Sequence, residues 1–73
     1  MSEKQQIIYM QTRLIRLASE KWNMSMERLI EIFTEYKVLQ YIEKCFGIFH
    51  VEGDEAVLED IEGYLKNRGM PNK

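Results

Sequence analysis

The chain has 73 residues, of which 45% are hydrophobic and 30% charged, and its formal net charge at pH 7 is −2. This length is enough for a single domain, 1–73, and the composition is that of a globular and not a disordered protein. One cysteine allows no internal disulfide, and one histidine leaves no typical metal-ligand cluster. We therefore expect one domain with no cofactor or metal, and with residues 1–3 and 70–73 fraying at its ends.

The first predicted helix covers residues 3–22. At 100° per residue its apolar side chains form a stripe that Met10 and Leu17 widen to nearly half of the cylinder, with Ile8 at its edge. Gln11 lies near the middle of this stripe, where a buried amide needs a partner and can fix the register of a helix–helix contact. Two interpretations stay open: the helix is central in the domain, or these four residues contact another protein or a second copy.

A second helix is predicted over residues 26–36, with Ser25 as its N-cap. A third is predicted over residues 38–46, with Gly47 at positive φ as its stop signal. The apolar residues that the second helix is expected to bury recur at helical spacing: Met26, Leu29, Ile30, Phe33 and Tyr36.

Residues 48–51 are bulky and too few to show a period, and we expect a short extended connection there. The last helix then begins with Asp54 as N-cap and stops at Gly69. The predicted fold class is therefore all-α, a compact bundle of four helices with an extended connection before the last one.

The last predicted helix carries an acidic stripe, because Glu55, Glu59 and Glu62 recur at i, i+4 and i+7. Such a stripe is either a solvated face or a surface that meets a basic partner. Both interpretations stay open.

His50 is the candidate that chemistry would nominate first, as a general base or a ligand-site residue. A base needs a reacting partner and an orienting group, and no serine nucleophile or glycine-rich phosphate loop lies near it in the sequence. We expect its ring to bond a backbone carbonyl in the turn into the last helix, and Cys45 to act as a small buried hydrophobe. The sequence thus predicts no catalytic residue and no enzyme.

Part of the chain resembles a known family of short bacterial proteins, domain-of-unknown-function family 3791. The residues that carry the resemblance are Met24-Ser25, Ile32-Phe33, Tyr36, Val38-Leu39, Tyr41-Ile42, His50, Gly53, Asp60-Ile61 and Tyr64-Leu65. The resemblance implies a helical fold and no catalytic or ligand residue. Family members are often encoded beside a protein resembling an ADP-ribosyltransferase, which implies a paired-partner role such as that of a toxin–antitoxin pair. Lys37 departs from the family, whose members tend to have Gly there, so a left-handed turn at this position would be strained.

We expect a cytoplasmic protein–protein interaction module, antitoxin-like, that binds another protein or itself. No apolar run approaches the ~20 residues of a membrane span, the N-terminal residues lack the order of a signal peptide, and a lone thiol fits a reducing compartment. The alternative is a nucleic-acid-binding regulator that acts as a dimer, with Arg13, Arg16 and Lys21 on phosphates. The acidic last helix disfavours nucleic acid, because it would repel a polyanion.

Overall fold

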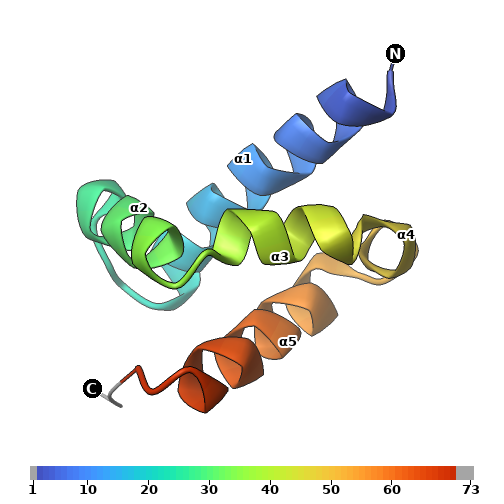
Figure 1. The fold of residues 1–73 in the computed structure, drawn as a ribbon. Helices are drawn as coiled ribbons and strands as arrows, with labels where there is room; N and C mark the ends of the chain where they lie inside the picture. The colour runs from blue at the N-terminus through green and yellow to red at the C-terminus, as the bar shows by residue number, and fades with distance from the viewer. Residues whose placement is uncertain (1, 71–73) are drawn as a thin grey trace.

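The regular structure of the chain is entirely helical over residues 2–70, the part that the computed structural model describes. The all-α prediction is therefore confirmed. The predicted bundle of four helices is replaced by five, because a short fourth helix precedes the last one. In chain order these are α1 (Glu3–Lys21), α2 (Met26–Glu35), α3 (Val38–Lys44), α4 (Phe46–Phe49) and α5 (Asp54–Asn67) (Figure 1).

The N-terminal end of α1 is closed by a reciprocal cap. The Ser2 hydroxyl accepts a hydrogen bond from the Gln5 amide at 3.2 Å, and the Gln5 side chain accepts one from the Ser2 amide at 3.3 Å. At the other end of the chain, the Met70 amide donates to the Leu65 carbonyl at 3.1 Å. Fraying was expected at residues 1–3 and 70–73. Of these, residues 2, 3 and 70 are hydrogen-bonded or helical, and residues 1 and 71–73 lie outside the described residues.

The α2–α3 connection reverses the chain at Lys37. Ser25 caps α2 as predicted, accepting from the Arg28 amide at 3.1 Å. Tyr36 then ends α2, and Lys37 takes a left-handed conformation with φ 58° and ψ 40° before α3 begins. A side chain in this region costs roughly 1 kcal/mol because its Cβ approaches the following carbonyl. The left-handed turn, which a lysine in place of glycine makes less favourable, is therefore present together with this strain.

Residues 48–51, expected to be an extended connection, are instead helical at 48 and 49 and form a turn at 50 and 51. Phe49 and His50 donate amide hydrogen bonds to the carbonyls of Cys45 and Phe46 at 2.8 and 2.9 Å, which closes the turn of α4. Gly47 therefore lies inside a helix and has no positive φ, so its predicted role as a stop signal is wrong. The physical reason is tertiary: Phe46 and Phe49, three positions apart, both become buried in the core when this segment coils.

The start of α5 differs from the prediction by one residue. Gly53 is the N-cap and Asp54 is the first helical residue. The Asp54 carboxylate instead faces Arg13 of α1, with three N···O distances of 3.1–3.3 Å, and forms an ion pair that joins the two helices. Its charge still lies in the first turn of α5, where the helix dipole favours an anion.

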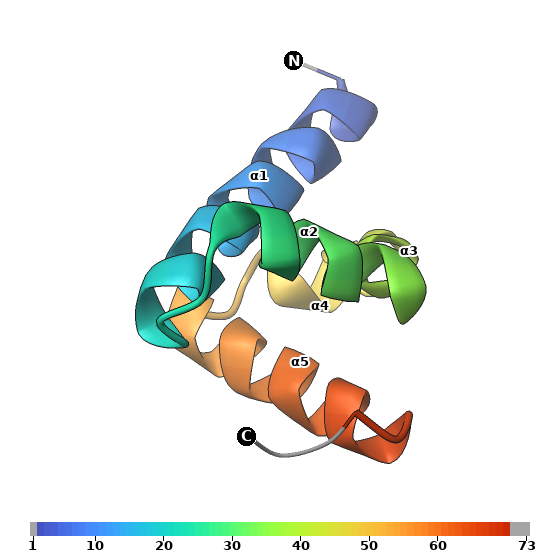
Figure 2. The same cartoon turned by 90° about the vertical axis from the view of Figure 1, so that its left-hand side faces the viewer.

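The core is built by all five helices, with α5 on one side and α1 and α2 on the other (Figure 2). The prediction for α2 was partly wrong, since Met26 and Ile30 are 44% and 48% exposed while Ile32 is buried. This helix packs on both α1 and α3, which turns its core stripe toward Ile32 and leaves one apolar flank outside. The buried residues are Met10, Leu14, Ala18, Leu29, Ile32, Phe33, Val38, Ile42, Phe46, Phe49, Val57, Leu58, Ile61 and Leu65.

Candidate functional site

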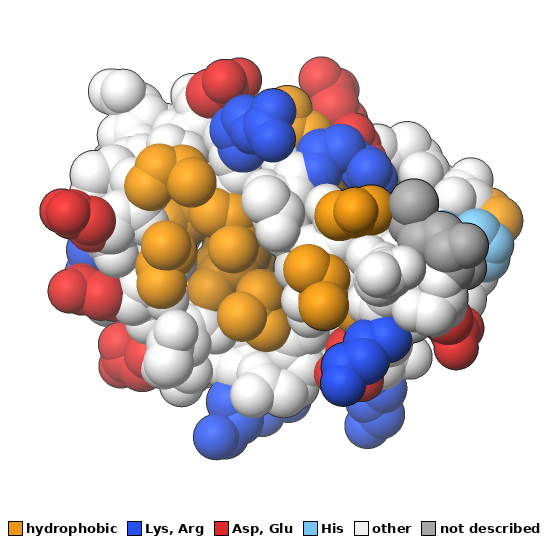
Figure 3. Space-filling model, turned by 90° about the horizontal axis from the view of Figure 1, so that it is seen from above, with side chains coloured by type: hydrophobic (Ala, Val, Ile, Leu, Met, Phe, Trp, Pro, Cys, Tyr) orange, Lys and Arg blue, Asp and Glu red, His pale blue; other side chains and the backbone are white. Residues whose placement is uncertain are grey.

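Large apolar side chains remain exposed on the first two helices. Ile8 of α1 is 48% exposed, like Ile30 of α2, and Met26 of α2 is 44% exposed. We call these three residues the α1–α2 face. Seen from above, hydrophobic side chains gather on the side of the molecule where α2 lies, with charged groups around them (Figure 3). Gathered apolar groups of this kind are typical of surfaces that contact another protein.

The other candidates on α1 are occupied within the domain. Met10 is buried in the core, so in this fold it is unavailable to a partner, and Leu17 is half-buried against the same core. The Gln11 amide nitrogen donates to the Leu39 carbonyl of α3 at 2.9 Å. That bond satisfies the half-buried amide inside the chain, and it links α1 to α3 without a second copy.

The acidic stripe of α5 is only partly open. Glu55 and Glu59 are exposed and Glu62 is half-buried. Among residues 2–70 none of the three carboxylates forms a salt bridge, and the acid of α5 that does is Asp54. The stripe therefore presents free negative charge to solvent or to a basic surface.

The cations assigned to nucleic-acid binding do not act as a group. All three are exposed, but Arg13 forms the ion pair with Asp54 described above, whereas Arg16 and Lys21 form no salt bridge within residues 2–70. A phosphate would have to compete with Asp54 for the Arg13 guanidinium. This arrangement weakens the nucleic-acid alternative.

His50 is exposed and its ring bonds within α4. Its Nδ1 atom lies 3.0 Å from the Phe46 carbonyl, and the ring stacks on the Phe46 ring at 5.2 Å between centroids. A backbone carbonyl is the expected type of partner, but it belongs to α4 and not to the turn before α5. No group of three or more His, Cys, Asp or Glu within the described part of the chain could hold a metal ion.

A groove of about 840 Å³ opens between α3–α4 and the C-terminal half of α5. Its lining combines three cations with three tyrosines and one acid, and it includes the half-buried Cys45. The lining residues are Glu35, Tyr36, Lys37, Gln40, Tyr41, Lys44, Cys45, Gly47, Ile48, Tyr64 and Arg68. We call it the α3–α5 groove.

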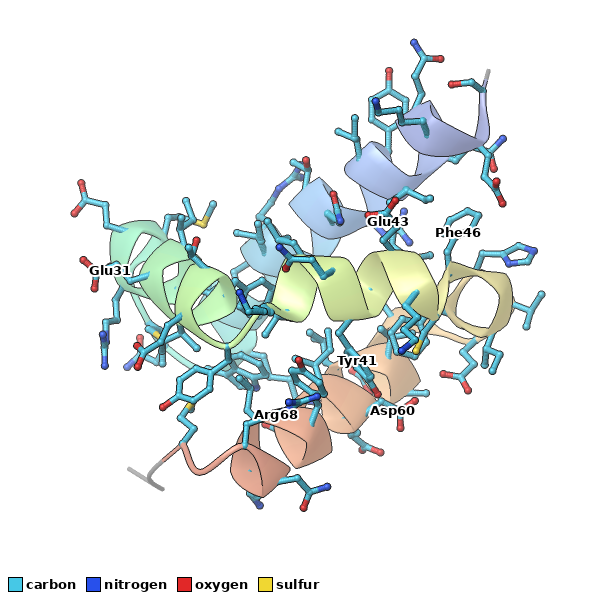
Figure 4. The ribbon with its side chains drawn as sticks, in the orientation of Figure 1. Glu31, Tyr41, Glu43, Phe46, Asp60 and Arg68 are labelled. Carbon is cyan, nitrogen blue, oxygen red and sulfur yellow. The ribbon has the colours of Figure 1, made fainter. Side chains whose placement is uncertain are left out.

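The floor of the α3–α5 groove is a packed aromatic stack. Tyr41 and Tyr64 stack with centroids 4.0 Å apart, and the Arg68 guanidinium lies 4.7 Å above the Tyr64 ring. The Tyr64 hydroxyl donates to the Tyr36 carbonyl at 2.8 Å, which ties α5 to the end of α2. In Figure 4 the Tyr41 side chain extends from α3 toward α5, and Glu43 lies on the opposite side of α3.

Within residues 2–70, Tyr41 is the residue whose pKa the fold clearly shifts. Burial raises the pKa of its hydroxyl above the ordinary value of 10.0, and the nearby Cys45, Asp60, Tyr64 and Glu52 raise it further. The Tyr41 hydroxyl therefore stays neutral at physiological pH.

The match to known proteins is at the level of a family. A family model for DUF3791, described as a protein of unknown function, matches residues 9–68. The chain belongs to this family. In the other two comparisons, neither a curated protein nor a solved structure matches the chain. The predicted resemblance is confirmed, and the DUF3791 match takes in the whole α3–α5 groove and all of the α1–α2 face except Ile8.

No helix within residues 2–70 of this DUF3791 protein is long and apolar enough to cross a membrane. The sequence analysis missed the α3–α5 groove. A weak signal was present, since Lys37, Gln40 and Lys44 recur at i, i+3 and i+7 and thus share the outer side of α3. Nothing in the sequence indicates that the end of α5 lies beside them.

Proposed function

We propose that this DUF3791 chain is a non-catalytic, cytoplasmic protein-interaction module, the neutralising member of a pair whose partner resembles an ADP-ribosyltransferase. The observation that carries the proposal is the α1–α2 face: Ile8, Met26 and Ile30 stay exposed although the domain has a complete core of its own. The paired-partner role comes from the family resemblance.

The α1–α2 face offers enough apolar surface to matter for binding. Burying a large aliphatic side chain is worth about 1.5–3 kcal/mol relative to leaving it exposed. Met26 and Ile30 are four positions apart on α2 and therefore reach the same partner surface. A partner that covers both side chains therefore gains the free energy of burying them when the complex forms.

The acidic stripe of α5 supports the same function in a different way. Glu55 and Glu59 are exposed, and charges at the rim of an interface mainly accelerate association with an oppositely charged partner. A basic surface on the partner is therefore favoured. Replacing both residues by Lys should slow association and leave the dissociation rate nearly unchanged.

The test is co-expression of the tagged chain with the protein encoded beside it. We expect the two to purify together, and we expect the chain to relieve any growth inhibition that the neighbour causes. Ile30→Glu should abolish both effects. Arg28→Gln, which changes the net charge by the same amount at an exposed position on the other side of α2, should preserve them. Failure of the wild-type chain to bind its neighbour would sink the proposal.

A further inference from the structure

The α3–α5 groove concentrates positive charge on an acidic protein. Its lining holds three of the chain's ten Lys and Arg residues but one of its twelve Asp and Glu residues. Lys37, Lys44 and Arg68 are all exposed, and none of them forms a salt bridge within residues 2–70. The lining thus carries three cations against one acid, although the whole chain has a net charge of −2, while Asp60 and Glu52 act on Tyr41 at its floor. An anion is therefore expected at the exposed cations of the rim.

The spacing of these cations indicates an extended ligand. Lys37 directly precedes α3 and Lys44 is its last residue, so at 1.5 Å per helical residue the two lie about 10 Å apart along the helix axis. Groups that hold a single phosphate converge on it. Cations spread along a helix instead fit carboxylates spread along a second chain.

The groove also has apolar surface that a ligand must cover. Ile48 is 61% exposed at its α4 end, and the stacked, half-buried Tyr41 and Tyr64 form the floor. The acidic stripe of α5 from a second copy could supply charge. However, no large hydrophobic side chain of α5 is exposed, so that stripe would leave the apolar floor uncovered. Exposed ion pairs alone contribute little to association.

We propose that the α3–α5 groove binds an acidic amphipathic segment of the partner protein, whose carboxylates reach Lys37, Lys44 and Arg68 while its apolar side chains cover Ile48 and the tyrosine floor. An amphipathic helix in a groove, with apolar anchors and flanking charges, is a recurrent mode of recognition. This inference rests on the proposed function and names a second contact surface of the same module.

The backbone at Lys37 provides a separate argument for the groove. Lysine is poorly suited to its left-handed conformation, where φ is 58°. Strained positions persist where the surrounding structure holds them, and they cluster at functional sites. At this position the side chain lines the groove and supplies one of its three cations.

Charge reversal tests the electrostatic part of the inference in the complex with the neighbouring-gene product. Lys44→Glu should weaken binding about tenfold, because it replaces an attraction by a repulsion. Lys4→Glu makes the same change in net charge on α1 and should weaken binding less than twofold. Equal effects of the two variants would overturn the inference. If the wild-type complex forms and neither variant changes it, the proposed function stands and the groove is not its site.

Photo-crosslinking identifies the occupant. Cys45→Ser combined with Ile48→Cys places one thiol at the exposed end of the groove, where a benzophenone maleimide is attached. Cys45→Ser combined with Glu43→Cys is the matched control, because Glu43 lies on the far side of α3 (Figure 4). Mass spectrometry should recover, from the Ile48→Cys variant, a partner segment with two or more Asp or Glu residues among apolar ones.

The remaining outcomes of the crosslinking experiment count against the inference. A segment without carboxylates, a segment of a second copy, or equal capture by the Glu43→Cys variant would each overturn the stated occupant. A complex that never forms would reject the proposed function as well. The two failures are therefore distinguishable.

Discussion

The α1–α2 face and the α3–α5 groove lie on one small domain but are built by opposite means. The face is made of exposed apolar side chains on two helices whose buried sides supply core residues such as Leu14 and Leu29. The groove is charged and aromatic, and it exists only because the end of α5 lies beside α3. The local amphipathic pattern of the helices produces the α1–α2 face, whereas the tertiary arrangement produces the α3–α5 groove. Each surface can therefore be altered without the other.

Leu14→Ala should damage both surfaces together, since Leu14 is fully buried in the core that supports them. The cavity left by the leucine should lower the free energy of unfolding by about 2–5 kcal/mol. For a domain of this size that loss is comparable with the total stability, roughly 4–11 kcal/mol. Thermal unfolding followed by circular dichroism measures it. Ile8→Ala is the control and should change stability by less than about 0.5 kcal/mol.

Met26→Ala combined with Ile30→Ala should affect the face alone. Partner affinity measured by calorimetry should fall at least tenfold, equivalent to about 1.4 kcal/mol. Stability should hardly change, because both side chains are already half-exposed. A large loss of stability instead would mean that these side chains belong to the core, and the distinction between the two surfaces would fail.

Tyr64→Phe should loosen the groove and leave the face intact. The substitution removes the 2.8 Å hydrogen bond to the Tyr36 carbonyl, which costs about 1 kcal/mol. Amide hydrogen exchange should rise at the end of α5 and not in α1. Tyr9→Phe, at a position that is 57% exposed, should change neither quantity.

Lys37→Gly should separate the stability of the groove from its charge. Glycine removes the left-handed strain, and the free energy of unfolding should rise by about 0.5–1 kcal/mol. Binding of the partner should weaken at the same time because one cation is lost. Chemical denaturation and calorimetry report the two effects. If binding is unchanged, the Lys37 side chain is not a contact.

The smallest expected effect is a pH dependence of stability that arises from the ionisation of Tyr41. Its pKa is raised in the folded protein, so the fold keeps the proton above pH 10 while the unfolded chain loses it. The contribution is therefore complete below the ordinary pKa of 10.0 and is lost as the pH rises through the folded value. Denaturation curves above and below pH 10 should show this decline for the wild type. The decline should be smaller for Tyr41→Phe, and an identical decline would contradict the assignment.

Local signals in the sequence were sufficient for most helix boundaries. Ser25 capped α2 as expected, and the periods of α1, α2 and α5 gave their ranges to within one residue. They failed where packing decided the outcome. Residues 48 and 49 were expected to be extended, but they join the helical turn of α4, in which the rings of Phe46 and Phe49 are both buried. Helix α2 turns Ile30 outward because it packs on two helices at once.

The candidate residues were predictable to different degrees. Ile8, Glu55 and Glu59 are exposed, as a contact surface requires, because the hydrophobic pattern itself places them at or beyond the edge of a core stripe. Met10 and Gln11 are engaged inside the domain, since α1 is covered by α2, α3 and α5 together. The α3–α5 groove joins residues 36 and 64 through a hydrogen bond across 28 positions, which no local pattern encodes.

An affinity pull-down of the tagged protein from its own cells, quantified by mass spectrometry against an untagged control, tests the central claim most directly. We predict one stoichiometric partner, retained by Arg28→Gln and lost with Ile30→Glu. Recovery of the chain alone, or of a partner whose yield is equal for both variants, would contradict the claim that this domain acts by binding another protein through its α1–α2 face.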